Sequence, residues 1–214
     1  MFVGSDIDSV TSYLIFSWLS GKRVPVTYVT RDTLKTESEK FFKNESQAGK
    51  IVYFINLDTS SIKNIVDRGN VVIIDHHPTH VAAKNKYVNC KTLIKEFSSC
   101  SKLIFNLLSA KFDNKLTKNQ KVLMFLVDDY ESYNFKLNGS YELGVIYDNL
   151  QGSKPVRFIS LYKDGFTGFT GDQLKIIEYY KRKFDKLKST LQVYTAGPHY
   201  IKGLSKYKNS YKYV

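Results

Sequence analysis

Residues 71–80 read Val-Val-Ile-Ile-Asp-His-His-Pro-Thr-His. The first four form a short β-branched run, which predicts a buried strand. Asp75, His76 and His77 follow directly, so three polar side chains stand at the end of that strand. Burying such groups without partners is costly, and a simple turn does not account for all three. This stretch therefore predicts that the end of the strand forms part of a functional site.

Three more apolar runs precede this strand. They are Phe2-Val3, residues 24–29 (VPVTYV) and residues 51–57 (IVYFINL). Segments with helical spacing separate the runs, at residues 9–20, 33–47 and 60–68, and a glycine closely follows each segment. This alternation of strands and helices predicts an α/β fold, in which a parallel β-sheet carries helices on both faces.

After His80 the pattern becomes mainly helical. Residues 99–110, 118–127 and 172–192 place apolar side chains at helical spacing, whereas residues 138–171 contain several glycines and are expected to be irregular. The sequence shows no repeat and no clear linker. We therefore expect a core over residues 1–135 and a mainly helical, basic C-terminal extension over residues 136–214 that packs on the core.

Composition narrows the class of protein. The 214 residues include 32 Lys and Arg against 20 Asp and Glu, a net charge of +12, and 43% of them are hydrophobic. These values exclude global disorder and favour a polyanionic partner. No apolar run approaches the roughly 20 residues that span a bilayer, and Cys90 and Cys100 form no Cys-x-x-Cys motif. We expect a cytoplasmic protein without membrane contact, in the host cytoplasm if a phage encodes it.

Aspartates follow three of the predicted strands. Asp6 and Asp8 come after the first run, Asp58 after IVYFINL, and Asp75 with the two histidines after VVII. Because the carboxyl ends of parallel strands share one edge, we expect these carboxylates and imidazoles to converge. Like charges at short range require a cation. Oxygen and imidazole ligands suit Mn²⁺ or Mg²⁺, and two such ions would activate water for in-line attack on phosphorus.

Each aspartate alone has a simpler explanation. Aspartate is common at helix N-caps and in strand-to-helix turns. Asp8 precedes Ser-Val-Thr-Ser and Asp58 precedes Thr-Ser-Ser, so each could serve only as a cap. That explanation does not account for the run from Asp75 to Pro78.

Four motifs, in this order and strand context, resemble those of the DHH phosphoesterase superfamily. That superfamily includes RecJ exonucleases, oligoribonuclease and pAp-phosphatase enzymes, cyclic-dinucleotide phosphodiesterases and DHH-type inorganic pyrophosphatases. The motifs are Ser5-Asp6-Ile7-Asp8-Ser9, Asp58, VVIIDHHPTH at 71–80 and FLVDDYESY at 125–133. The resemblance covers about residues 1–135.

The resemblance implies a metal-dependent phosphodiesterase or phosphohydrolase that uses two ions, Mn²⁺ or Mg²⁺, and acts on short single-stranded oligonucleotides or small nucleotides. The implied metal ligands are Asp6, Asp8, Asp58, His76 and Asp128. Asp58 would bridge the ions, Asp75 would orient a ligand histidine, and His77 would contact metal or phosphate. Asp129 competes with Asp128, which is favoured because it comes first after the apolar run KVLMFLV.

Three features depart from the family's pattern. Residues 2–5 (FVGS) lack the histidine that members usually carry shortly before the Asp-x-Asp pair, and Ser9 stands where a glycine is common. No glycine-rich, histidine-containing motif of a second domain follows residue 140. A catalytically degenerate DHH protein that binds nucleic acid or nucleotide without turnover is therefore the alternative.

Three further points stay open in the sequence. A protein-interaction scaffold whose basic surface meets an acidic partner is a third hypothesis. His80 is close enough in sequence to the DHH run to contact phosphate, whereas His199 would need the extension to fold back over the site. The sequence does not determine the oligomeric state, and a homodimer is one of the open alternatives.

Overall fold

The computed structural model describes residues 1–47 and 49–190. Its strands form one sheet in the order β2-β1-β3-β4-β5, and every neighbouring pair of strands is parallel. The predicted α/β class with a parallel sheet is confirmed. The strands are β1 (Phe2–Gly4), β2 (Thr27–Val29), β3 (Val52–Ile55), β4 (Val71–Asp75) and β5 (Lys91–Ile94).

Helices connect the strands and continue after them. The α-helices are α1 (Ile7–Ser20), α2 (Leu34–Lys43), α3 (Lys63–Val66), α4 (Pro78–Ala83), α5 (Cys100–Leu108), α6 (Lys118–Glu131), α7 (Ser140–Asp148), α8 (Lys154–Tyr162) and α9 (Gly171–Thr190). Short 3₁₀ turns lie at Glu45–Gln47, Ser60–Ile62 and Lys84–Lys86. The predicted helix at 172–192 is thus present as far as it falls within the described residues.

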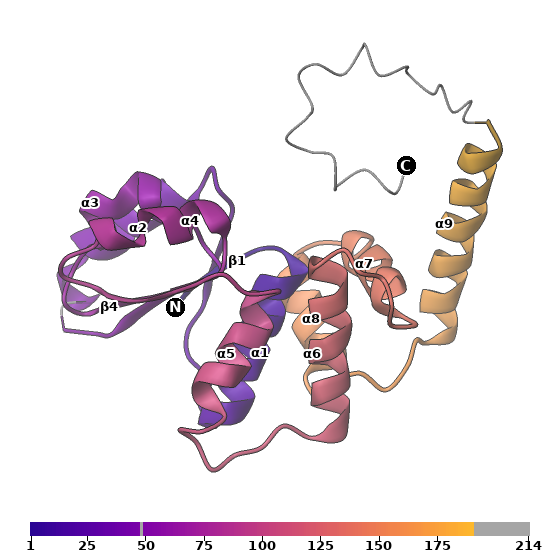
Figure 1. The fold of residues 1–214 in the computed structure, drawn as a ribbon, viewed down its shortest axis with the longest axis horizontal. Coiled ribbons are helices and arrows are strands. Elements are labelled where there is room, and N and C mark those ends of the chain that lie inside the picture. The colour runs from indigo at the N-terminus through magenta and orange to yellow at the C-terminus, as the bar shows by residue number, and fades with distance from the viewer. Residues whose placement is uncertain (48, 191–214) are drawn as a thin grey trace. The chain divides into compact units, whose positions relative to one another are not determined.

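Helices cover both faces of the sheet (Figure 1), because successive strand residues point to opposite faces. Val3, Ile55 and Ile74 pack against α1 and α5 in one core cluster. Their neighbours Phe2, Phe54 and Ile73 pack on the other face, against apolar side chains of α2, α3 and α4. Both clusters are apolar and buried, which holds the carboxyl ends of the strands along one edge of the sheet.

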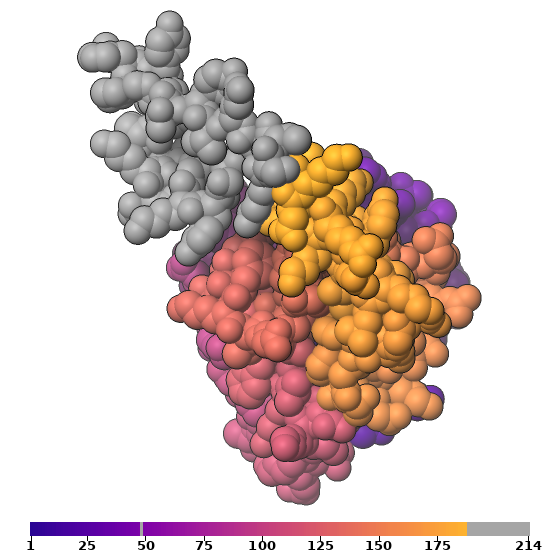
Figure 2. Space-filling view, turned by 90° about the vertical axis from the view of Figure 1, so that its right-hand side faces the viewer, coloured from indigo at the N-terminus to yellow at the C-terminus, as the bar shows by residue number. Residues whose placement is uncertain are grey.

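A third cluster joins α6, α7 and α8 to the outer side of α1. Its buried members are Ile7, Val10, Leu14, Leu123, Leu126, Val127, Leu143, Tyr147, Phe158 and Tyr162. Figure 2 shows the outer surface of α6 and α7 in rose and salmon. Gly144 permits the close approach of α7 to α6, since a Cβ there would lie 2.0 Å from a ring carbon of Tyr130.

One sequence expectation about secondary structure was wrong. Residues 138–171 are not irregular throughout, because they contain α7 and α8. Pro155, Phe158 and Tyr162 give α8 a buried stripe at helical spacing, which the flanking glycines concealed. The stretch after His80 is mainly helical as expected, and it also contains an unexpected strand, β5, whose four residues pair with β4 at the sheet edge.

Residues Met1–Ile177 form one compact unit, and a second unit begins at Glu178, within α9. The predicted division after residue 135 stays a prediction. Among the described residues, the helices lack the combination of length and apolar character that a membrane crossing needs.

Candidate metal centre

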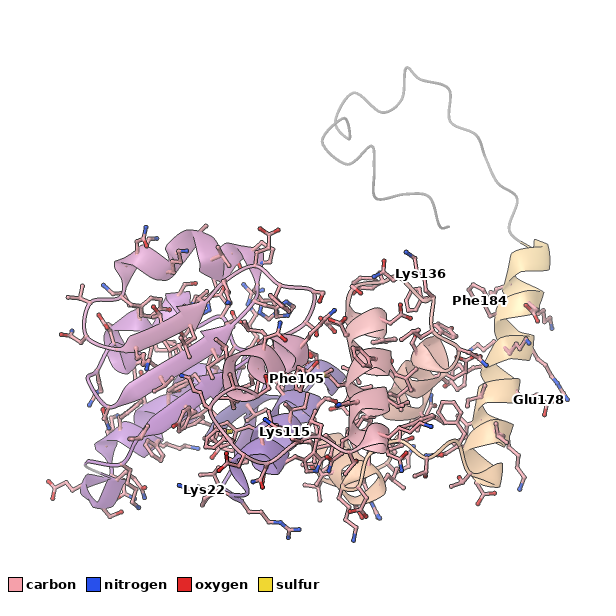
Figure 3. The ribbon with its side chains drawn as sticks, turned by 60° about the horizontal axis from the view of Figure 1, so that its bottom comes forward. Lys22, Phe105, Lys115, Lys136, Glu178 and Phe184 are labelled. Carbon is pink, nitrogen blue, oxygen red and sulfur yellow. The ribbon has the colours of Figure 1, made fainter. Side chains whose placement is uncertain are left out.

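Most of the predicted site residues lie at or just after the ends of β1, β3 and β4, at the carboxyl edge of the sheet where α1 begins, and Asp128 lies in the last turn of α6. Figure 3 shows Lys136 just beyond the end of α6, whereas Lys22 and Lys115 lie toward the opposite end of these helices. The candidate site therefore lies on the Lys136 side of the first unit.

Asp6 is the N-cap of α1. Its Oδ1 accepts from the backbone N of Ser9 at 2.7 Å and from Asn56 Nδ2 at 3.2 Å, and its Oδ2 accepts from Ser9 Oγ at 2.8 Å. The side chain is nevertheless exposed at the sheet edge. Asp6 therefore combines a capping role with an accessible carboxylate.

Asp8 does not cap its own helix. It is fully buried in the first turn of α1, and its carboxylate accepts from the backbone N of Cys100 at 2.7 Å and of Ser101 at 3.0 Å. These two amides begin α5, so Asp8 links the starts of two helices. Burial, followed by the charge of Asp6, raises the pKa of Asp8. The negative charge of Asp8 is thus poorly compensated by the protein.

His76 has one ring nitrogen satisfied and one not. Its Nδ1 lies 3.0 Å from the carbonyl oxygen of Phe97, which can only accept, so Nδ1 carries the hydrogen. In the neutral ring, Nε2 then presents a lone pair. This atom is buried without a hydrogen-bond partner and lies 3.7 Å from Oδ2 of Asp8. The imidazole is therefore fixed in the tautomer that a metal ligand requires.

Asp75 is fully buried and holds two other histidines. Its Oδ1 accepts from His77 Nδ1 at 2.7 Å and its Oδ2 accepts from His80 Nδ1 at 2.6 Å. Burial would raise the pKa of Asp75, but these two hydrogen bonds outweigh it and lower the pKa to about 2. The hydrogen bond that His77 donates to Asp75 raises the pKa of His77 to about 9. His76, by contrast, is oriented by Phe97 rather than by Asp75.

His80 has a structural environment. It is fully buried, and its Nε2 lies 2.8 Å from Tyr87 Oη and 3.3 Å from Thr59 Oγ1. This burial argues against the phosphate contact considered for it. His199 lies outside the described residues.

Asp58 is half-buried after β3. Its Oδ1 accepts from the backbone N of Ser60 at 2.9 Å and its Oδ2 accepts from Thr79 Oγ1 at 2.7 Å. Partial burial would raise the pKa of Asp58, but the hydrogen bonds from Ser60 and Thr79 leave it below its usual value. The carboxylate is therefore charged and stands between the ends of β3 and β4.

Asp128 and Asp129 have different surroundings although they are adjacent on α6. The Oδ1 of Asp128 accepts from Ser98 Oγ at 2.5 Å and Ser99 Oγ at 2.7 Å, and its Oδ2 accepts from Lys102 Nζ at 2.8 Å. It thus lies at the start of α5, as Asp8 does. The carboxylate of Asp129 is engaged in a turn instead. That turn donates from Lys136 N, Leu137 N and Ser140 Oγ.

Two residues near the site, Glu131 and Asn56, were not expected from the sequence. Burial, followed by the charges of Asp8 and Asp6, raises the pKa of Glu131 to about 7, so this carboxyl group belongs to the same electrostatic cluster. Its position three residues after Asp128 on one helix could have indicated this. Asn56 donates to Asp6 while its own Oδ1 is buried without a partner. The position of Asn56 directly after β3 could have indicated that it lies at the strand ends.

A cleft of about 1180 Å³ opens at the carboxyl edge of the sheet, and its lining includes neither Asp8 nor His76. Asp6, Asp58, His77 and Glu131 line it near the strand ends. Arg31, which follows β2, and Lys154, which begins α8, add positive charge elsewhere in its wall. The cleft gives a bound molecule access to carboxylates and cations together.

The residues fit a hard divalent cation in chemistry. Carboxylate oxygens and one free imidazole nitrogen are ligands that Mn²⁺ or Mg²⁺ accepts. In residues 1–47 and 49–190, however, no three His, Cys, Asp or Glu side chains already stand together as a ligand set. Asp58 is held by Ser60 and Thr79, so it would exchange these hydrogen bonds for the ion.

Neither a protein-family model nor a curated protein matches this chain.

Proposed function

We propose that this chain is a divalent-metal-dependent phosphohydrolase of the DHH type. The observation that carries the proposal is the pair formed by Asp8 and His76. A buried imidazole nitrogen without a hydrogen-bond partner lies 3.7 Å from a carboxylate oxygen of the fully buried Asp8. Leaving such groups unsatisfied is costly, and a cation at this point would relieve the cost.

The residues that would hold the metal are Asp6, Asp8, Asp58 and His76. A divalent ion, Mn²⁺ or Mg²⁺, would supply positive charge that acidifies water and offsets the charge developing on phosphate oxygens. Phe97 and the first amides of α5 orient His76 and Asp8 for this role.

Residues that line the cleft would act on the substrate directly. His77 is held through Nδ1 by Asp75, which leaves its Nε2 to donate to a phosphate oxygen. Glu131 lines the same cleft and would accept the proton of the attacking water. The water oxygen would form the new bond to phosphorus, the ester P–O bond would break, and the leaving oxygen would be protonated by solvent.

The cleft supports a substrate of nucleotide size. Its volume of about 1180 Å³ exceeds that of ordinary small-molecule pockets, and Arg31 and Lys154 suit additional phosphate groups. Tyr28 and Tyr130 in its wall offer aromatic surface for a base. Short single-stranded oligonucleotides and small nucleotides are the substrate classes that combine these features.

A hydrolysis assay tests the proposed function. A 5′-labelled short RNA or DNA oligomer, a pAp analogue and a cyclic dinucleotide would be incubated with Mn²⁺ or with EDTA. We expect turnover with Mn²⁺, lost with EDTA and in Asp58→Asn, and kept in the exposed-site control Asp113→Asn. Turnover that persists in EDTA or in Asp58→Asn would overturn the proposal.

A binding protein without turnover is the second candidate, because Asp128 is already neutralised by Lys102 and β1 provides no histidine. Binding of the oligomer by both wild type and Asp58→Asn, with no hydrolysis by either protein, would favour it.

A further inference from the structure

Lys102 occupies an unfavourable position for a cation. It is the third residue of α5, and the amino end of a helix carries partial positive charge. Its ammonium group nevertheless lies there, with only about a third of the side chain exposed. The compensation is Asp128, whose Oδ2 accepts from Lys102 Nζ at 2.8 Å.

Asp128 is consequently satisfied by the protein alone. One carboxylate oxygen receives two serine hydroxyl groups and the other receives a full positive charge. Asp8, at the start of the same helix, accepts from neutral donors, among them the amides of Cys100 and Ser101, and its Oδ2 lies 3.7 Å from the unpartnered Nε2 of His76. The two carboxylates therefore differ in their need for an added cation.

The first strand adds no ligand that could compete with this arrangement. Phe2 and Val3 are buried in the two sheet cores. Gly4 has no room for a side chain, since a Cβ there would lie 2.3 Å from Ser9 Oγ. No side chain of β1 can thus bring a nitrogen atom to the site.

We infer that the ammonium group of Lys102 takes the place of a second metal ion, so that this chain binds one divalent cation, at Asp8 and His76, and not two. The inference rests on the proposed function and refines it. A second divalent ion at Asp128 would meet the ammonium charge at short range, or would have to displace it from its carboxylate partner.

Counting bound Mn²⁺ tests the inference without reference to activity. Calorimetric titration and the loss of the free-ion electron paramagnetic resonance signal both give the stoichiometry. We expect one ion per chain in wild type, in Lys102→Arg, which keeps the charge, and in the exposed control Lys111→Met. We expect two ions in Lys102→Met, whose freed Asp128 carboxylate becomes a ligand. Circular dichroism would verify that each variant is folded.

Two results would overturn the inference while leaving the proposed function intact. They are two ions in wild type, or a single ion in a folded Lys102→Met variant. Asp128→Asn provides an independent check, because it should still bind one ion, and loss of that ion would make Asp128 a ligand of it. Absence of Mn²⁺ binding from wild type and all variants would instead remove the proposed function together with the inference.

Discussion

Nε2 of His76 lies 3.7 Å from Oδ2 of Asp8, and both side chains are buried. The carbonyl of Phe97 fixes the hydrogen of His76 on Nδ1, and the buried Nε2 has no donor within the described residues. A buried ring nitrogen without a partner beside a buried carboxyl group is costly, and a cation bound to both atoms would lower this cost. This relationship is the reason why we centre the proposed metal site on Asp8 and His76.

Asp129 is expected to stabilise the fold and to have no part in metal binding. Its carboxylate accepts from two backbone amides and from Ser140 Oγ. Asp129→Asn replaces an acceptor with a donor, so the free energy of unfolding should fall by about 1–3 kcal/mol. Urea denaturation measures this loss, with Asp113→Asn as the control. Unchanged stability with weakened Mn²⁺ binding would mean that Asp129, and not its neighbour, serves the site.

Asp67 should make the protein acid-sensitive in a defined pH range. Burial would raise its pKa, but hydrogen bonds from the backbone N of Cys90, Val88 and Asn89 lower it to about 2, from a reference value of 3.8. A carboxyl group with a lowered folded-state pKa stabilises the protein above its unfolded pKa. That contribution should therefore be complete above about pH 4 and be lost as the pH falls toward 2.

Denaturation of Asp67→Asn at several pH values tests this assignment. The variant should be less stable than wild type at pH 6, and the difference should shrink as the pH approaches 2. A difference that stays constant over this range would show that the carboxylate charge contributes nothing.

Gly4 should be intolerant of a side chain because of the site and not because of its backbone angles. A Cβ at Gly4 would lie 2.3 Å from Ser9 Oγ and would displace the hydroxyl that donates to Asp6. Gly4→Ala should cost about 1–3 kcal/mol of stability and also weaken Mn²⁺ binding. Gly69→Ala meets no atom within 4 Å and should stay within about 1 kcal/mol of wild type. Equal effects of the two substitutions in thermal melts would contradict this explanation.

The sequence predicted the placement of the site residues but not their partners. Asp6, Asp58 and Asp75 could be placed at one edge because parallel strands end together, whatever their side chains contact. Which histidine Asp75 holds depends on the rotamers of His77 and His80 across the start of α4, and no sequence pattern encodes these. The ion pair between Lys102 and Asp128 joins two helices and also depends on side-chain rotamers, so it could not be predicted from the sequence.

The missed helices and strand have physical explanations as well. The α7 and α8 helices are short, and their stability depends on the shared core with α1 and α6 more than on local propensity. The β5 strand has four residues, KTLI, and becomes a strand by pairing with β4. Tertiary packing determines whether these short elements form, whereas the longer apolar runs could be recognised from the sequence alone.

Calorimetric titration of Mn²⁺ into wild type and His76→Phe tests the central claim most directly, because Phe keeps the ring volume and removes both nitrogen atoms. Asp113→Asn serves as the surface control, and circular dichroism verifies the fold of each variant. The account predicts Mn²⁺ binding by wild type and by the control, and an affinity at least about 10-fold lower in His76→Phe. Equal affinities in wild type and in folded His76→Phe, or no binding by wild type, would contradict it.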